Sequence, residues 1–575
     1  MNGKKLLALS LAGVMSLGLL AGCGGGGNAT TPAPGDTTAP GDTSAPSAGF
    51  NMSVCIASEP QTIDPALNSA VDGAIMTQHM FEGLMKWSDS GHPVNEKGNM
   101  NYAALAAGQA ESYEKTDNGD GTVTYTFKIR SDAKWSDGQP VTANDFVYSW
   151  QRLANPLTAA DYCYMIDMVQ GYAAVNAGEA DPTTLGVSAP DESTFVVNLT
   201  YDCPYFLEIC AFPAAFPVRQ DIIEAYGDTW TTDDNSSHYI SNGPWKLAEW
   251  VHDSYIKMVP NEYHYDAANL GPNSLTFQLM EDQNSMLAAY RSGDLQFIED
   301  MPVDEIAGLL ASGELNIVDY IGTYYVCYQT FDNALVRQAF TLAIDSKYIV
   351  EQVTQTGQVP ATGFVPAGIY DADANGDDFR TVGGDYWDAP VDDATYQANC
   401  EKARQLLAEA GYPNGEGFPT VTYLYNTSDA HKAVGEALQQ MWQEELGVTV
   451  QLQNQEWNAF LETRKKGEYQ IARNGWIADY NDPCSFLDMW YTGGGNNDAQ
   501  YSNPEYDAMI DAAKATSDPA ERMSYFHKAE DIIIGQDWAL GPIYFYTQKY
   551  MMADDISGAF YTPLGYFIYG YCTKG

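Results

Sequence analysis

The residue types that carry most enzymatic and metal chemistry occur in this chain without the spacing that such chemistry needs. The seven histidines form no metal-ligand pair, and no GxSxG, HExxH or GxxxxGK[ST] pattern is present. None of the nine cysteines stands in a CxxC pair, which excludes zinc-ribbon and thioredoxin-type sites. Many carboxylates could act as an acid/base pair, but no spacing singles one out. The sequence therefore favours a binding protein over an enzyme, and we expect no cofactor.

A calcium-binding site is a further chemical possibility, but its pattern is incomplete. Asp371, Asp373, Asn375 and Asp377 have the spacing that begins a calcium-binding loop, but the twelfth position is Val382 in place of a bidentate glutamate. We therefore interpret the segment 371–377 as an acidic surface loop.

The cysteines leave two interpretations open. Export would permit disulfides, yet scattered cysteines in a large core are often small buried hydrophobic residues. We expect mostly free thiols, and Cys203 with Cys210 if any pair forms.

The N-terminus predicts export and lipid attachment. Two lysines precede an apolar stretch, a pattern typical of a signal peptide over residues 1–22. The run Leu-Ala-Gly-Cys ending at Cys23 resembles a bacterial lipobox, in which the cysteine is lipidated; an ordinary secretion signal is the alternative. Residues 23–49 should form a disordered tether, because Gly, Ala, Thr, Pro, Asp and Ser dominate them. We expect an extracytoplasmic protein anchored by lipid to the outer face of the bacterial cytoplasmic membrane.

The composition and length of the chain limit which class of protein it can form. The formal net charge is −48, so phosphate backbones would repel the protein and nucleic acid is not expected as a partner. Hydrophobic residues make up 45% and aromatic residues 13% of the chain, which indicates a well-packed globular protein. More than 500 residues exceed one ordinary core, so two or three domains are expected.

Local patterns predict alternating strands and helices, and hence α/β domains. A hairpin turn is expected over 117–121 and a helix start at Asn503-Pro504. The expected strands are 122–130, 193–199 and 448–453. The expected helices are 143–153, 336–353 and 431–447, the last capped by Gly447.

Four stretches together resemble extracellular solute-binding proteins of family 5, the peptide-binding components of ABC importers. They are SEPQTIDP (58–65) with FEGLMKW (81–87); FKIRSDAKWSDGQPVTANDFVYSWQR (127–152); SNGPWKLAEW (241–250) with YRSGDLQF (290–297); and LYNTSDAHK (424–432) with NQEWNAFLETRKKGEYQIARNGWIADYNDPCSFL (454–487). They follow the family order over the whole body. The last stretch looks more like the oligopeptide-binding branch than the dipeptide, nickel or glutathione branches.

The resemblance implies a two-lobed periplasmic-binding-protein-like α/β fold, type II and cluster C-like, with an additional domain and a two-segment hinge. The ligand would be trapped between the lobes. Carried over to this chain, domain I combines 50–72, 200–320 and 547–575, domain II is 73–199, and domain III is 321–546.

The resemblance also suggests site residues. Asp479 matches the aspartate that pairs with a peptide α-ammonium group, and the alternative is a capping or loop aspartate. Arg473, Arg464 and His431 match positive positions near the peptide C-terminus. For the arginines, and more so for Arg464, the alternative is an internal ion pair, and for His431 it is a structural role.

The remaining site residues would contact the peptide main chain and side chains. Glu59-Pro60-Gln61 and Gly475-Trp476-Ile477 are expected to pair with an extended peptide as an added strand. Pocket or lid positions, which could equally be core, are Trp457, Trp476, Tyr162, Tyr325 and Tyr546. Some relatives carry a disulfide beside the site at the positions of Gly322 and Ile477, and both cysteines are absent here.

We therefore expect a monomeric receptor that binds short peptides and delivers them to an ABC permease and its ATPase subunits. The alternatives on the same fold are a peptide pheromone receptor, or a receptor for a non-peptide solute such as a sugar, nickel or an opine.

Overall fold

The computed structural model describes residues 49–98, 100–231, 237–372 and 377–575. The signal peptide, Cys23 and nearly all of the expected tether lie outside the described residues, and so does the centre of the acidic loop 371–377. No helix in the described part of the chain is long and apolar enough to cross a membrane.

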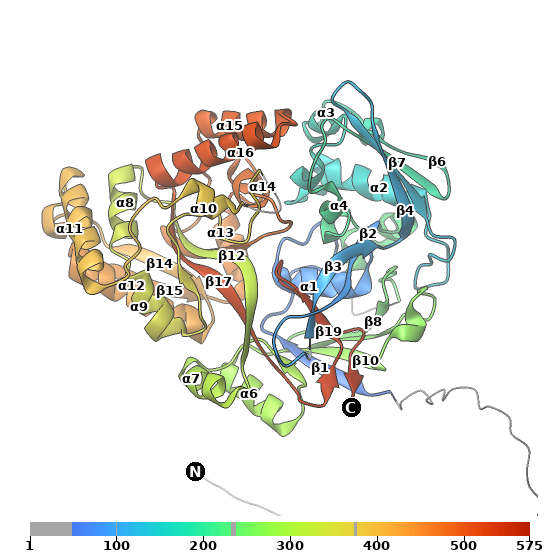
Figure 1. Cartoon of the computed structure of the whole chain (residues 1–575), viewed down its shortest axis with the longest axis horizontal. Coiled ribbons are helices and arrows are strands. Elements are labelled where there is room, and N and C mark those ends of the chain that lie inside the picture. Colours follow the sequence, from blue (N-terminus) through green and yellow to red (C-terminus); the bar gives the residue numbers. More distant parts are fainter. Residues whose placement is uncertain (1–48, 99, 232–236, 373–376) are drawn as a thin grey trace, which may run out of the picture. The chain divides into compact units, whose positions relative to one another are not determined.

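A long mixed sheet runs through the described body (Figure 1). Parallel pairing joins β1 to β10 and β11, and β14 to β15 and β16, whereas the other pairs are antiparallel. In spatial order the strands are β15 (Val450–Gln455), β14 (Val421–Asn426), β16 (Ile471–Ile477), β12 (Asn316–Tyr328), β17 (Leu540–Met552), β11 (Phe297–Ile298), β1 (Asn51–Ile56), β10 (Ser274–Leu279), β9 (Tyr255–Pro260) and β8 (Trp245–Val251), with β13 (Val359–Pro360) beside β17.

Strands β12 and β17 connect the two parts of this sheet. Each has 13 residues and so extends about 43 Å at roughly 3.3 Å per residue. In Figure 1 they run side by side between helices α8 (Ala334–Leu342), α11 (Asp393–Glu409) and α12 (Asp429–Leu446) and strands β1, β10 and β19. Their pairing shifts register between Asp319 and Thr323. Such an irregularity bends a strand locally.

Two smaller sheets lie outside the long one. One has the order β2 (Met85–Pro93), β3 (Met100–Ala107), β19 (Ala559–Thr562) and β20 (Tyr566–Ile568). The other has the order β4 (Ala110–Asp117), β5 (Val123–Ile129), β7 (Thr194–Leu199) and β6 (Val187–Asp191), with α2 (Ala143–Ala154) packed on it. The expected hairpin turn between β4 and β5 is confirmed, and Gly119 and Gly121 adopt the positive φ values that it requires.

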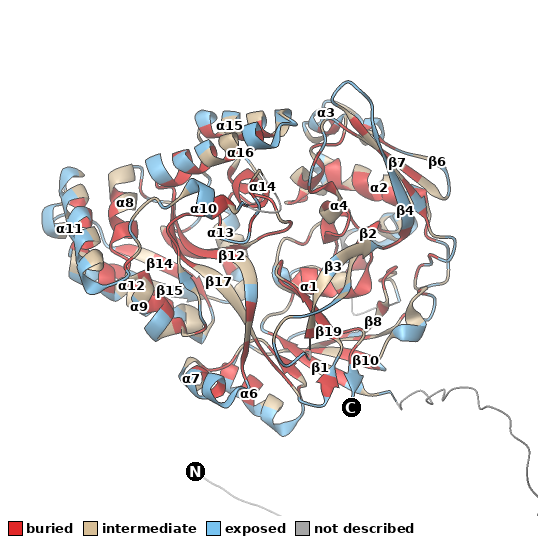
Figure 2. Ribbon diagram, in the orientation of Figure 1, coloured by how far each residue is buried: buried red, intermediate tan, exposed pale blue. Residues whose placement is uncertain are grey.

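Most of the expected elements are confirmed by the structure. Helix α12 begins after Ser428, whose hydroxyl accepts the His431 N–H, and ends at Gly447 in the left-handed conformation. Helix α15 (Pro504–Ala515) begins after Asn503, which caps it as expected. In Figure 2, α11 exposes most of its surface and α14 (Cys484–Leu487) is buried.

Two expectations about local structure were wrong. The segment 336–353 is not one helix: α8 ends at Leu342, and Asp345 starts a new turn by accepting the Tyr348 N–H at 3.0 Å. Aspartate and serine compete for backbone hydrogen bonds in this way, and so they favour a cap over a helix interior. The strand expected over 448–453 is displaced by two residues, since β15 covers Val450–Gln455.

All eight cysteines after Cys23 are free thiols, and seven of them are buried. The expectation of mostly free thiols is therefore confirmed, and Cys203 and Cys210 form no disulfide.

Candidate ligand-binding site

A cavity of about 330 Å³ lies beside the C-terminal end of β16, and this volume falls within the range of about 300–1,000 Å³ that is usual for ligand sites. Its walls come from residues between Gln61 and Pro213, from Tyr320, from α13 (Trp457–Lys465) and β16, and from residues after β16 as far as Tyr566. The residues proposed from the sequence that line it are Gln61, Tyr162, Trp457, Arg464, Arg473, Gly475, Trp476, Ile477, Asp479 and Tyr546. The other three, Glu59, Tyr325 and His431, do not line it.

Asp479 lies just beyond the end of β16 and is only 9% exposed. Its Oδ1 accepts a hydrogen bond from the Tyr162 hydroxyl at 3.1 Å, and its own N–H donates to Ser485 Oγ at 2.8 Å. Its Oδ2 has no hydrogen-bond partner within the described part of the chain. Burial raises the pKa of this carboxyl well above its ordinary value, although Tyr162 opposes the rise. A cation brought into the cavity would therefore stabilise the carboxylate.

Arg473 lies on β16 and is 8% exposed. Its guanidinium stacks over the rings of Tyr324, Trp457 and Phe460 at 5.6, 5.9 and 5.6 Å. No carboxylate among the described residues lies within ion-pair distance of it. The cavity wall thus includes a buried cation that lacks an anion, as well as a buried carboxyl that lacks a cation.

His431 lies behind Arg473 instead of on the cavity wall. Burial and the neighbouring guanidinium lower the pKa of His431 well below its ordinary value, so the ring is neutral. Its Nε2 lies 2.7 Å from Nη2 of Arg473, which can only donate. His431 therefore accepts this hydrogen bond and orients the guanidinium.

Arg464 forms an internal ion pair, which was the alternative to ligand binding for this residue. Its Nε lies 2.6 Å from Asp498 Oδ2, and both side chains are largely buried. The Arg464 charge is therefore compensated by the protein itself, unlike that of Arg473.

The backbone of β16 offers a free edge beside the cavity. Gly475, Trp476 and Ile477 pair with β12 on one side. On the other side, β14 pairs only with Ile471 and Ala472, so the described residues leave that edge of 473–477 without a strand partner. Gly475 is needed here, because a Cβ would lie 2.4 Å from the Tyr546 hydroxyl. Glycine and free main-chain groups together suit an extended ligand.

The facing segment 59–61 is not a strand, because β1 ends at Ile56. Gln61 lines the cavity and donates to Glu462 Oε1 at 2.9 Å. The Glu59 carboxylate is instead held by His252 and by the Asp253 N–H.

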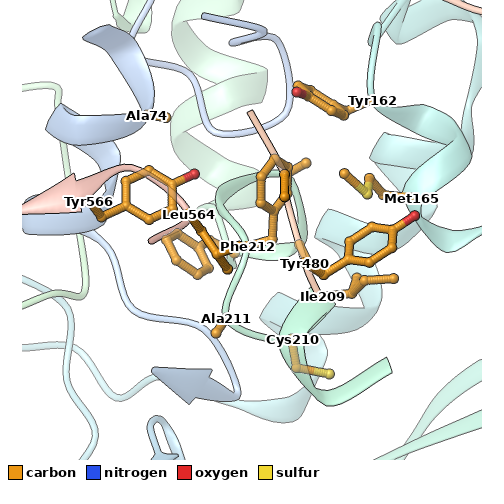
Figure 3. Close-up of a cluster of buried hydrophobic side chains, with 14 of the residues drawn as sticks. Ala74, Tyr162, Met165, Ile209, Cys210, Ala211, Phe212, Tyr480, Leu564 and Tyr566 are labelled. Atoms are coloured by element: carbon orange, nitrogen blue, oxygen red, sulfur yellow. The ribbon is translucent and has the colours of Figure 1, made fainter. Parts of the chain in front are cut away.

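Aromatic rings form much of the wall. The Tyr162 ring packs edge-on against Phe212 with centroids 5.0 Å apart, and Figure 3 shows this pair in one apolar cluster with Leu564 and Tyr566. All four residues line the cavity. Tyr325 differs, because it is fully buried between Phe364 and Trp490 and belongs to the core.

The structure also adds wall residues that the sequence analysis missed. Asp161 lines the cavity and accepts from Lys465 at 2.6 Å and from Ser69 at 3.0 Å. Asp72 does not line this cavity, but it accepts from the indole of the wall residue Trp457 at 3.1 Å. No motif marks these positions, since each contact joins segments that are far apart in the sequence.

Gly322 and Ile477 are direct partners across β12 and β16. A Cβ on Gly322 would lie 2.4 Å from the end of the Ile477 side chain. The space that a disulfide beside the site would need is therefore filled by isoleucine.

Known proteins resemble the chain over nearly all of its length. The model of the bacterial extracellular solute-binding proteins, family 5, matches residues 104–498. The periplasmic oligopeptide-binding protein OppA of Salmonella typhimurium is 34% identical over 510 residues, which cover 87% of this chain and 88% of that protein. The oligopeptide-binding protein OppA of Bacillus subtilis is 31% identical over 88% of this chain and 89% of that protein. The chain belongs to family 5 of the extracellular solute-binding proteins, and it is a binding protein and not an enzyme.

Solved structures confirm the two-lobed periplasmic-binding-protein fold. The crystal structure of Haemophilus influenzae OppA in complex with RPPGFSPFR superposes with a TM-score of 0.82 at 31% identity, covering 92% of this chain and all of that one. Relatives differ in ligand, since a 31% identical protein of Escherichia coli is named a probable deoxycholate-binding protein and covers 85% of this chain and 86% of its own length.

Two structures of one relative differ in how well they superpose with this chain. The murein tripeptide-binding protein MppA of Escherichia coli superposes with a TM-score of 0.81, covering 92% of this chain and 99% of that one. Its unliganded open form superposes with only 0.57, over 90% and 95%. The described structure therefore differs from an open form of this fold.

Proposed function

We propose that this solute-binding protein captures oligopeptides outside the cell and delivers them to an ABC permease that cytoplasmic ATPase subunits drive. The observation that supports it most strongly is the pair of uncompensated buried groups, Asp479 and Arg473, in one cavity. A peptide carries an ammonium group and a carboxylate on one short chain. Binding such a chain would supply the missing partner to both groups at once.

In this proposal the peptide lies extended along the free edge of β16. Its ammonium group pairs with Asp479, its main chain bonds to 475–477, and its carboxylate faces Arg473. Main-chain hydrogen bonds are indifferent to peptide sequence, which suits a receptor for many peptides. The peptide side chains contact the rings of Trp457, Trp476, Tyr162 and Tyr546, while Gln61 faces the ligand from the opposite wall. Glu59 and Tyr325 have no ligand contact in this arrangement.

We further propose that the lobes turn about the register shift in β12 and β17, with 321–546 as domain III and the remaining body as domains I and II. Contacts across the division support a closed state. Lys514 of α15 bridges Asp488 at 2.7 Å and also pairs with Asp167 of the other part, and Asp161 is bound by Lys465. A ligand that touches both parts would shift the equilibrium toward closure.

Attachment to the membrane through a lipid on Cys23 completes the proposal. Replacing Cys23 by serine should release the protein into the medium or periplasm without changing its affinity for peptides. A protein that stays in the membrane fraction after this substitution would exclude Cys23 as the anchor.

Mass spectrometry of the molecules released by denaturing the purified protein tests the proposed ligand. A mixture of short peptides of varied sequence is the expected result. A single peptide would indicate a pheromone receptor. A sugar, a nickel ion or a bile acid in place of peptides would overturn the proposal while leaving the family assignment intact.

A further inference from the structure

A second cavity, of about 220 Å³, adjoins the first. Val71, Trp457 and Arg473 line both cavities, whereas Asp479 lines only the first. The second cavity therefore opens at the Arg473 end, where the proposed peptide arrangement places the C-terminal residue.

Three carboxyl groups line this second cavity, Asp72, Glu299 and Asp300, beside the polar residues Ser58 and Asn426 and the Arg473 guanidinium. Asp300 is compensated by Lys549 at 2.9 Å. Asp72 accepts only from neutral groups, the Trp457 indole and the Gly73 N–H. Glu299 likewise accepts from the Gln548 amide at 2.9 Å and from the Tyr569 hydroxyl at 3.4 Å. Within the described part of the chain neither Asp72 nor Glu299 has an ion-pair partner.

Burial is the main influence on both carboxyls, and for Glu299 the charge of Lys549 opposes the rise in pKa. Burial raises the pKa of Asp72 to about 7. Burial, and next the charge of Asp300, raise the pKa of Glu299 to about 8. A ligand cation beside them would stabilise the charged form of each group.

A buried amide adds an independent sign of a missing donor. Asn426, at the end of β14, is 7% exposed and lines the cavity, and its Oδ1 has no hydrogen-bond partner among the described residues. Buried polar atoms are nearly always hydrogen-bonded in folded proteins. The cavity thus presents carboxylate and amide acceptors to a group that would have to be rich in donors.

The remaining wall is apolar and suits an aliphatic stem. Ile56, Val71, Ile75 and Met286 line the space. Long basic side chains bury their methylene groups against such surfaces while the charged end reaches a polar region. A metal ion is a poorer occupant, because the described residues contain no group of three or more histidine, cysteine or acidic side chains that could hold one.

Resting on the proposed peptide-binding function, we propose that the second cavity binds the lysine or arginine side chain of the C-terminal residue of the peptide. The carboxylate of that residue pairs with Arg473, and its side chain passes Trp457 to reach Asp72, Glu299 and Asn426. The protein is therefore selective for peptides with a basic C-terminal residue.

Calorimetric titration with matched alanine peptides that end in lysine, norleucine or glutamate tests this inference. Norleucine keeps the aliphatic stem of lysine and lacks its charge. We expect the lysine peptide to bind about tenfold to hundredfold more tightly than the norleucine peptide, the range of a charge-assisted hydrogen bond. The glutamate peptide should bind the most weakly.

The double variant Asp72→Asn and Glu299→Gln should abolish the preference for lysine, since it removes the charge-assisted term, whereas binding of the norleucine peptide should persist. The double variant Glu401→Gln and Glu409→Gln is the matched control, because both residues are exposed on α11 and two carboxyl groups are likewise replaced by amides. Its preference for lysine should persist.

The outcomes separate this inference from the proposed function. Equal affinities for the lysine and norleucine peptides, or a lysine preference that survives in the Asp72 and Glu299 variant, would overturn the inference alone. If no norleucine peptide binds in an Asp479-dependent way, the proposed function itself fails. Retained binding of the norleucine peptide by the variant shows that it is folded.

Discussion

Replacing Asp479 by alanine is the perturbation whose size follows most directly from the site. The Asp479 carboxyl is buried and keeps one oxygen without a partner, so in the proposed complex the peptide ammonium group depends on it for charge compensation. Removing one member of a buried, hydrogen-bonded charge pair costs about 2–5 kcal/mol. At about 1.4 kcal/mol per tenfold change, the affinity should fall by about 30-fold to about 4,000-fold.

The assay compares a peptide with a free amine and the same peptide acetylated at its N-terminus. Calorimetric titration should show that wild-type protein binds the acetylated peptide weakly, and that Asp479→Ala changes this weak binding little. The two changes together form a double-mutant cycle, which isolates the ammonium–carboxylate interaction from any general effect of the substitution.

A control variant distinguishes the interaction between Asp479 and the peptide ammonium group from the general effect of the acidic residues around the cavity. Glu462 lies on the cavity rim, where its side chain is 46% exposed. Glu462→Gln, like Asp479→Ala, removes one carboxyl group, and an exposed pair is worth only about 0–1 kcal/mol, so the affinity should fall by less than about fivefold. Unchanged affinity of Asp479→Ala for free-amine peptides, or equal losses in both variants, would refute the reasoning.

Three further predictions concern closure and the strand edge. In the proposed closed state, burial raises the pKa of Asp479, so this state holds more protons than an open, hydrated one. Small-angle scattering of the ligand-free protein should therefore show more closure as the pH falls. An opposite trend, or none, would contradict this. Lys514→Ala should lower the affinity for every peptide by about tenfold or more, because Asp488 then stays buried without a cation in the closed form. Calorimetry should find that the preference for a free amine is unchanged. Loss of that preference would show that Lys514 acts on the ligand. In Gly475→Ala the new Cβ would clash with the Tyr546 hydroxyl, so titration should show weaker binding of all peptides. A loss of affinity that is confined to peptides with particular side chains would argue against a shared main-chain contact.

The sequence was sufficient for much of the fold because its signals are local. Ser428 and Gly447 mark the two ends of α12, and Asn503-Pro504 marks the start of α15, since caps and turns depend on neighbouring residues only. The same reasoning failed over 336–353, where apolar periodicity continues through a break that Asp345 imposes.

The site was predictable only in part, because it depends on contacts that are distant in the sequence. Family motifs located Asp479 and Arg473, whose uncompensated burial the structure then revealed. They did not show that Asp498 already neutralises Arg464, or that Tyr325 belongs to the core. Local patterns carry no information on such pairings.

The second cavity illustrates the same limit. Asp72, Glu299 and Asn426 come from a helix, a loop after β11 and the end of β14, and tertiary packing alone brings them together. Each residue is unremarkable in its own segment, so only the assembled structure shows that three acceptors surround one space without enough donors.

A crystal structure of the protein purified with its own ligand and left undenatured tests the central claim most directly. We expect an extended peptide beside 475–477, with its ammonium group within hydrogen-bond distance of Asp479 and its carboxylate facing Arg473. A ligand that lacks an amine at Asp479, or a peptide bound in the reverse direction with its carboxylate at Asp479, would contradict it.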